Sequence, residues 1–63
     1  MLDIKTAEVT GTILGDTNSS YKFDEGDRIV YIPKSLVIYR EDEDSGTSVL
    51  TIPLWLAIKE ELV

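Results

Sequence analysis

The chain has 63 residues, with twelve acidic and six basic side chains that give a net charge of −6, and it contains no cysteine and no histidine. The absence of cysteine excludes disulfides, and the negative charge disfavours direct binding to nucleic acid, because contacts with phosphates require positive charge. A single domain of this size, spanning 1–63, buries only about 60% of the surface of its unfolded chain, so its core is small and we expect a homo-oligomer or a subunit.

The first predicted element is a long strand. Apolar and polar side chains alternate over residues 4–14, which is typical of a strand with one buried face. Val9, Gly11 and Ile13 fall on the dry face, and the isolated glycine predicts either a bulge or a close approach of another backbone segment. A polar loop is expected to follow at residues 15–20.

Four further short runs of β-forming residues follow along the chain. Acidic turns separate the second run from the third and the fourth from the fifth, which is typical of hairpins. Pro33 ends the third run and predicts a sharp corner directly into the fourth, because proline lacks a backbone donor. The four strands are expected at residues 21–23, 28–32, 36–40 and 48–52.

The C-terminal segment predicts a short helix. Pro53 is preorganised for the first helical position, and apolar residues recur at helical spacing as far as residue 62. Trp55 shares this register with Leu54 and Ile58, so we expect it in the core beneath the helix. The alternative is that Trp55 and Leu56 lie at or near a contact with a second copy or a partner, because the segment is apolar on more than one side.

Together these elements predict a mainly β (β+α) fold. We expect four or five antiparallel strands in a small curled sheet or partial barrel, with one short C-terminal helix across one end. No apolar run approaches the ~20 residues that span a bilayer, and the N-terminus lacks the pattern of a signal peptide. We therefore expect a cytoplasmic protein without membrane contact.

No combination of residues indicates catalysis. Ser35 lies beside Lys34, but no third group is available to orient them. The carboxylates are too numerous for any pair to stand out, and so short a chain leaves little room for a cleft. Asp42 and Asp44 resemble part of a calcium loop with the wrong spacing. We expect no enzyme activity, no catalytic residues, no metal and no cofactor.

Two proline motifs are similar to those of a known family. An aromatic-x-Pro-Lys-Ser step at Tyr31–Ser35 is followed by an acidic hairpin and a Pro-x-Trp-Leu-Ala helix at Pro53–Ala57. This pattern resembles a family of small uncharacterised proteins encoded by phages and prophages, over roughly the C-terminal half of the chain. The family has no activity that could be assigned to residues of this chain. The resemblance implies a phage-type protein that acts in the cytoplasm of a host cell.

Acidic phage proteins of this size commonly act by occupying a surface of a host protein. The first hypothesis is therefore a non-enzymatic inhibitor or modulator of a host defence or nucleic-acid enzyme, of the restriction, CRISPR or repair type, with acidic DNA mimicry as one mechanism. The partner would be a host protein with a basic surface. The residues expected to bind it are the acidic side chains of two turns: Glu41, Asp42, Glu43, Asp44, Asp24, Glu25 and Asp27.

Two alternatives remain open. One is an accessory binding module of phage DNA replication or recombination, and the other is a sponge for a signalling nucleotide held between subunits. Both require basic side chains to converge on one face. The side chains in question are Lys5, Lys22, Arg28, Lys34, Arg40 and Lys59.

Overall fold

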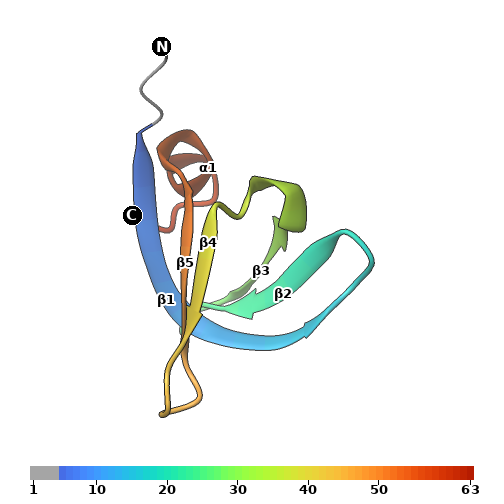
Figure 1. The fold of residues 1–63 in the computed structure, drawn as a ribbon. Coiled ribbons are helices and arrows are strands. Elements are labelled where there is room, and N and C mark those ends of the chain that lie inside the picture. The colour runs from blue at the N-terminus through green and yellow to red at the C-terminus, as the bar shows by residue number, and fades with distance from the viewer. Residues whose placement is uncertain (1–4) are drawn as a thin grey trace.

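A computed structural model describes residues 5–63 as one antiparallel sheet with a short helix at its C-terminal end (Figure 1). This confirms the expected fold class. Five strands, one 3-10 helix and one α-helix follow one another in this order: β1 (Thr6–Asp16), β2 (Ser20–Asp24), β3 (Ile29–Pro33), η1 (Lys34–Leu36), β4 (Tyr39–Asp42), β5 (Ser48–Pro53) and α1 (Leu54–Lys59).

The sheet is organised around β1, which pairs with strands on both sides. The strand order is β3-β2-β1-β5-β4, so the first and last strands of the chain are neighbours. The N-terminal half of β1 pairs with β5, and its C-terminal half pairs with β2 across a register shift between Ile13 and Gly15. Figure 1 shows how β1 curves between these two partners. Within the described residues, β3 and β4 are the two edges of an unclosed sheet.

The core lies on the concave face of this sheet. Val9 of β1 is buried there, and Ile13 packs against the buried residues, so the predicted dry face of the first strand is confirmed. The close approach predicted at Gly11 is also confirmed, because a Cβ atom there would lie 2.8 Å from the Phe23 ring and closer still to the Asp24 carbonyl oxygen. The buried hydrophobic residues are Val9, Phe23, Val30, Ile32, Leu50, Ile52, Leu56 and Ala57.

Two predicted strands differ from the structure by two or more residues at a boundary, and the other three differ by one residue at most. The first strand, expected at 4–14, continues to Asp16, and residue 4 lies outside the described residues. The fourth strand, expected to start at residue 36, begins only at Tyr39. The reason is that the chain after Pro33 turns through η1, which the Val37 N–H closes by donating to the Lys34 carbonyl.

The helix is shorter than expected and buries a different face. It covers Leu54–Lys59 rather than residues 53–62, and the Leu54 N–H donates to the Lys5 carbonyl beside β1. The prediction that Trp55 lies in the core is wrong, because 55% of this residue is exposed. Leu56 and Ala57 are buried instead. The helix follows β5 without a loop, so the end of the strand decides which side chains face the sheet.

The helix ends in a Schellman motif that lacks the usual glycine. The Leu62 N–H donates to the Ala57 carbonyl, and the Glu61 N–H donates to the Ile58 carbonyl. Glu61 occupies the left-handed position, with φ of 58°. Leu62 packs against the core, which is the hydrophobic contact that commonly accompanies this motif. The C-terminal end of the chain is thereby fastened to the sheet.

Candidate partner-binding surface

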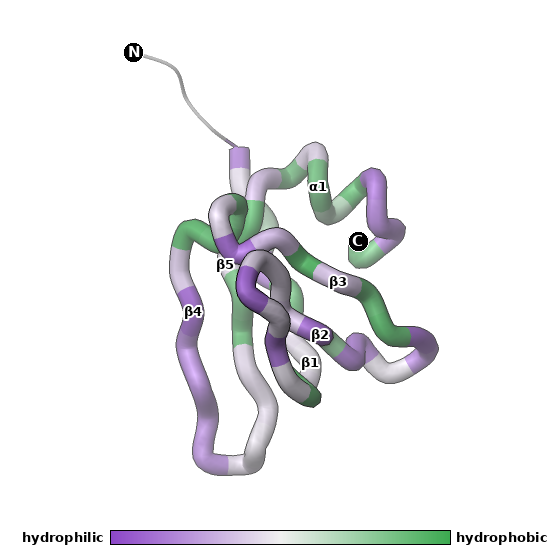
Figure 2. The backbone as a smooth tube through the Cα atoms, turned by 90° about the vertical axis from the view of Figure 1, so that its right-hand side faces the viewer, coloured by the Kyte–Doolittle hydropathy of each residue, from purple (hydrophilic) through white to green (hydrophobic). Residues whose placement is uncertain are grey.

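The two predicted acidic groups lie in different parts of the molecule. One occupies the β4–β5 hairpin and the other the turn between β2 and β3. The last residue of β2 lies opposite Thr12 of β1, and the first residue of β5 lies opposite Gly11. The β2–β3 turn therefore extends from this point toward the N-terminal end of β1, whereas the β4–β5 hairpin extends toward its C-terminal end. Figure 2 shows the hairpin and the β2–β3 turn at separate extremities of the fold. The seven carboxylates therefore do not form one negative surface.

The acidic residues of the hairpin are exposed on a defined turn. Glu41, Asp42, Glu43 and Asp44 are all exposed. The Glu43 N–H donates to the Thr47 carbonyl, and the Thr47 hydroxyl donates to the Glu43 carboxylate over 3.0 Å. These bonds stabilise the turn against the repulsion between neighbouring carboxylates.

Asp42 differs from its neighbours because its charge is engaged within the chain. Arg40 donates to its two carboxylate oxygens over 2.9 and 3.1 Å, and the Ser48 hydroxyl donates over 2.7 Å. The hydrogen bond from Arg40, followed by that from Ser48, lowers the pKa of Asp42 below its usual value. Asp42, and then Tyr21, raises the pKa of Arg40. The outward negative charge of the hairpin therefore comes from Glu41, Glu43 and Asp44.

The two faces of β4 carry different chemistry. Arg40 and Asp42 pair with Leu50 and Ser48, which are both buried, so they lie on the concave face. Tyr39 and Glu41 alternate with them and lie on the outer face of the sheet. Tyr39 is 61% exposed, so an aromatic ring stands beside the outward carboxylates. We define the hairpin surface as these outward residues: Tyr39, Glu41, Glu43 and Asp44.

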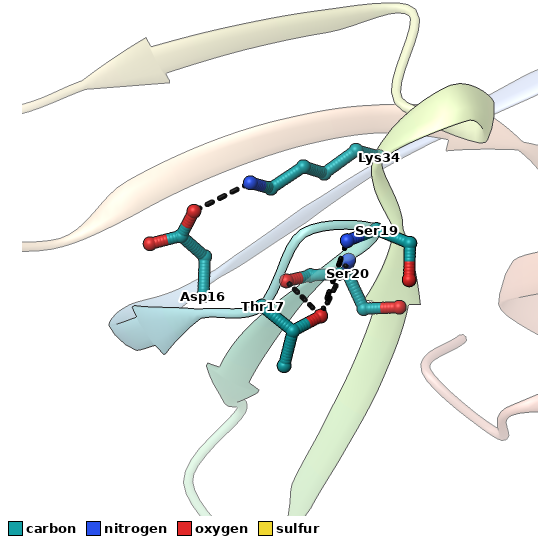
Figure 3. A network of polar contacts seen from close by, with 5 residues as sticks. All are labelled: Asp16, Thr17, Ser19, Ser20 and Lys34. Carbon is teal, nitrogen blue, oxygen red and sulfur yellow. Dashed lines mark hydrogen bonds and ion pairs between the residues drawn. The ribbon is translucent and has the colours of Figure 1, made fainter.

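A polar network that sequence reasoning did not predict lies at the concave face. The Lys34 ammonium and the Arg40 guanidinium lie 5.4 and 5.3 Å from the centre of the Tyr21 ring. Lys34 also donates to Asp16, as Figure 3 shows, and this hydrogen bond lowers the pKa of Asp16. In the sequence, only the alternation that places Tyr21 on the same face as Phe23 pointed to this network. Lys34 and Arg40 come from other elements, so their approach to the ring could not be predicted from local spacing.

The loop between β1 and β2 supports this network. The Thr17 hydroxyl accepts hydrogen bonds from the N–H groups of Ser19 and Ser20 (Figure 3). The Ser19 carbonyl in turn accepts a hydrogen bond from the Lys34 N–H over 2.8 Å, which fastens η1 to the start of β2. The backbone of Lys34 is thus fixed, and its side chain is held between Asp16 and the Tyr21 ring.

The carboxylates of the β2–β3 turn mainly serve the turn itself. Asp24 accepts a hydrogen bond from the Gly26 N–H over 2.9 Å, and Gly26 has a positive φ of 115°. Glu25 lies 3.9 Å from Arg28 in an ion pair. Asp27 is exposed at the same turn. Two of its three carboxylates bind other groups of the chain, so this turn offers a partner less free negative charge than the hairpin surface does.

The basic side chains do not gather on one face. Lys34 and Arg40 share the Tyr21 ring, but each also pairs with a carboxylate. Lys22 lies on the opposite face of β2 from Tyr21, because neighbouring strand residues alternate. Arg28 lies in the β2–β3 turn, next to Glu25. Of these four, only Lys34 and Arg40 lie together, whereas the replication-module and nucleotide-sponge hypotheses require a larger basic group on one face.

The described residues 5–63 contain no cavity and no group of three or more side chains that could hold a metal ion. No helix in this part of the chain is long and apolar enough to cross a membrane. Comparison of the chain with protein-family models, with curated proteins and with solved structures finds no match. These comparisons therefore supply no function, and the surface of this fold and the sequence pattern are what remain to indicate one.

Proposed function

We propose that this protein is a non-enzymatic binding protein that occupies a basic surface on another protein through its hairpin surface. The observation that carries the proposal is the combination, on one projecting hairpin, of outward carboxylates with the exposed ring of Tyr39. Carboxylates steer a basic partner and set its orientation, whereas an aromatic side chain supplies apolar contact area at the centre of an interface.

The internal pairing of Asp42 strengthens the proposal. Arg40 lies on the same strand as Glu41, and it is bound to Asp42 on the concave face. The outer face of β4 is therefore left with Glu41 as its charged group. A positive surface that approaches this face meets negative charge without a competing cation of the same strand.

The target that we propose is a host defence or nucleic-acid enzyme, of the restriction, CRISPR or repair type. Such enzymes carry basic surfaces that bind phosphates, and a row of carboxylates can occupy them in place of DNA. The resemblance to small phage and prophage proteins supports this target class. The separation of the two acidic turns limits the DNA-like element to the hairpin, so the mimicry involves one short stretch of phosphates rather than a long duplex.

The test is capture from a bacterial lysate on the immobilised protein. The hairpin variant E41Q/E43Q/D44N removes three charges and leaves the Arg40–Asp42 pair in place. We expect a captured protein to be retained by the wild type and lost from the hairpin variant. Its binding should also weaken as the salt concentration rises from about 0.05 M to about 0.5 M, because screening shortens the reach of these charges.

The control variant E25Q/D27N/E60Q removes the same number of charges from the β2–β3 turn and the helix end. It should retain the captured protein as well as the wild type does, since the control makes the chain less negative by the same amount without changing the hairpin surface. A captured protein that is lost equally from both variants would show that net charge alone governs binding. One that is retained equally by both would show that the hairpin surface is not the binding site.

A second surface supports the expected self-association. Trp55 and Ile58 are 55% and 59% exposed and lie three residues apart on α1, so their side chains are neighbours on one side of the helix. We propose that this side meets a second copy of the chain. Leu56 is buried in its own core and does not take part. Sedimentation at tens of micromolar should show a dimer that Trp55→Ala converts to monomer.

A further inference from the structure

The edge strand β4 has backbone groups that face away from the sheet. Across the hairpin, the Glu43 N–H donates to the Thr47 carbonyl, so these two residues form a bonded pair. Bonded and non-bonded pairs alternate along antiparallel strands, so Glu41 also directs its N–H and C=O toward β5. The N–H and C=O groups of Arg40 and Asp42 then face the open edge. All four residues of β4 are exposed.

A second copy of the chain does not suit this edge. Two β4 strands related by a two-fold axis would place Arg40 of each copy opposite Asp42 of the other. Glu41 would then lie opposite itself, with the Cα atoms about 4.5 Å apart in a non-bonded pair. Like charges directly opposite one another are destabilising. A segment that pairs with the β4 edge must instead carry positive charge.

We infer that β4 pairs with an extended basic segment of the partner protein, which adds a strand to the sheet. The inference rests on the proposed function and specifies how the partner is held. Backbone hydrogen bonds to Arg40 and Asp42 supply the pairing, as in other cases of strand addition. On the outer face, a basic side chain of the added strand lies opposite Glu41 and an apolar or β-branched one lies beside Tyr39, both favourable cross-strand pairs.

The probe for this inference is a short peptide with the repeat Lys-Thr-Val-Thr, which places Lys and Val in turn on one face of the added strand. Titration into the ¹⁵N-labelled protein at low salt should shift the amide signals of Arg40 and Asp42 and slow their hydrogen exchange. The same peptide with every backbone amide N-methylated keeps its charge and loses its donors. We expect it to bind roughly tenfold or more weakly, because two backbone hydrogen bonds are lost and the added methyl groups obstruct pairing.

A pair of variants tests the same edge from the side of the protein. Arg40→Pro and Arg40→Ala both remove the guanidinium, but only Arg40→Pro also removes the outward N–H. Proline is tolerated on edge strands, and retained dispersion of the amide signals will verify that the variant folds. Arg40→Pro should bind the unmodified peptide roughly tenfold more weakly than Arg40→Ala does. If Arg40→Pro does not fold, the comparison of the two peptides on the wild type decides the question.

The outcomes separate strand addition from simple electrostatic docking. If both peptides bind the wild type equally and E41Q/E43Q/D44N weakens both, the hairpin surface binds basic partners but strand addition is overturned. Equal binding of the unmodified peptide to Arg40→Pro and Arg40→Ala overturns it as well. If neither peptide binds at low salt, strand addition and the proposed binding of a basic partner are both refuted.

Discussion

Gly11 is a position at which this fold has no room for a side chain. A Cβ atom there would lie 2.8 Å from the Phe23 ring and closer to the Asp24 carbonyl oxygen, which is backbone and cannot rotate away. Overpacking typically costs about 1–3 kcal/mol. Because one obstacle is backbone, we expect Gly11→Ala to lower the free energy of unfolding by about 2 kcal/mol, after the gain of up to ~1 kcal/mol from a less flexible unfolded chain.

This loss is large for so small a domain. Domains of this size have a total stability of about 3–9 kcal/mol, and each kcal/mol shifts the melting temperature by about 4–8 °C. Urea unfolding followed by circular dichroism should therefore give a lower midpoint with an unchanged slope, and thermal unfolding a Tm lower by roughly 8–16 °C. The matched control is Gly15→Ala on the same strand, where a Cβ atom would meet nothing within 4 Å.

The control separates steric conflict from a general effect of replacing glycine in a strand. Gly15→Ala should leave stability unchanged or raise it by up to about 1 kcal/mol, because it only restricts the unfolded chain. Phe23→Leu combined with Gly11→Ala should cost less than the sum of the two single changes, since the ring is one of the two obstacles. A Gly11→Ala variant as stable as the wild type, or a Gly15→Ala variant that loses as much, would refute this account of the β1–β2 packing.

Two further predictions concern the helix end and the hairpin ion pair. Glu61 holds a left-handed conformation that costs roughly 1–2 kcal/mol for a non-glycine residue. Glycine gives back about 0.5–1 kcal/mol of this through its freer unfolded chain, so Glu61→Gly should gain about 1 kcal/mol and raise Tm by about 4–8 °C, whereas Glu60→Gly at φ of −89° should not. Because the pKa of Asp42 is lowered in the folded state, its contribution to the free energy of unfolding is complete above its usual pKa of 3.8. This contribution is lost as the pH falls through the folded-state pKa. The difference in urea midpoint between the wild type and Asp42→Asn should accordingly be constant from about pH 5 to 7 and shrink below about pH 4; a difference independent of pH would contradict the assigned cause.

The strands could be predicted because their information is local. Alternation identified the buried face of β1, and the prolines marked the end of β3 and the start of the helix. The strand order could not be predicted in the same way, since it depends on the pairing of β1 with β5, which lie at opposite ends of the chain. The sequence therefore left open whether the two acidic turns would meet, and the pairing separates them.

The side of the helix that is buried was also beyond local reasoning. In a helix of six residues the hydrophobic spacing covers fewer than two turns, so Trp55 and Leu56 are equally compatible with burial. The direction in which β5 delivers the chain decides between them. The network around Tyr21 was missed for a related reason, because Lys34 and Arg40 approach the ring only after η1 has turned the chain from β3 toward β4.

Arg40 connects the stability of the sheet to the surface that we propose for binding. Its guanidinium lies over Tyr21 and binds Asp42, so it joins β4 to β2 across the concave face, where no backbone hydrogen bonds link the two strands. The same pairing leaves the outer face of β4 negative, and the backbone of Arg40 faces the open edge. A neutral residue at this position would release Asp42 and increase the negative charge of the hairpin, yet it would loosen β4 from the rest of the fold. The hairpin therefore keeps a moderate charge on a strand whose side chains tie it to β2, and such ordering before binding reduces the entropy that is lost when a segment pairs with it.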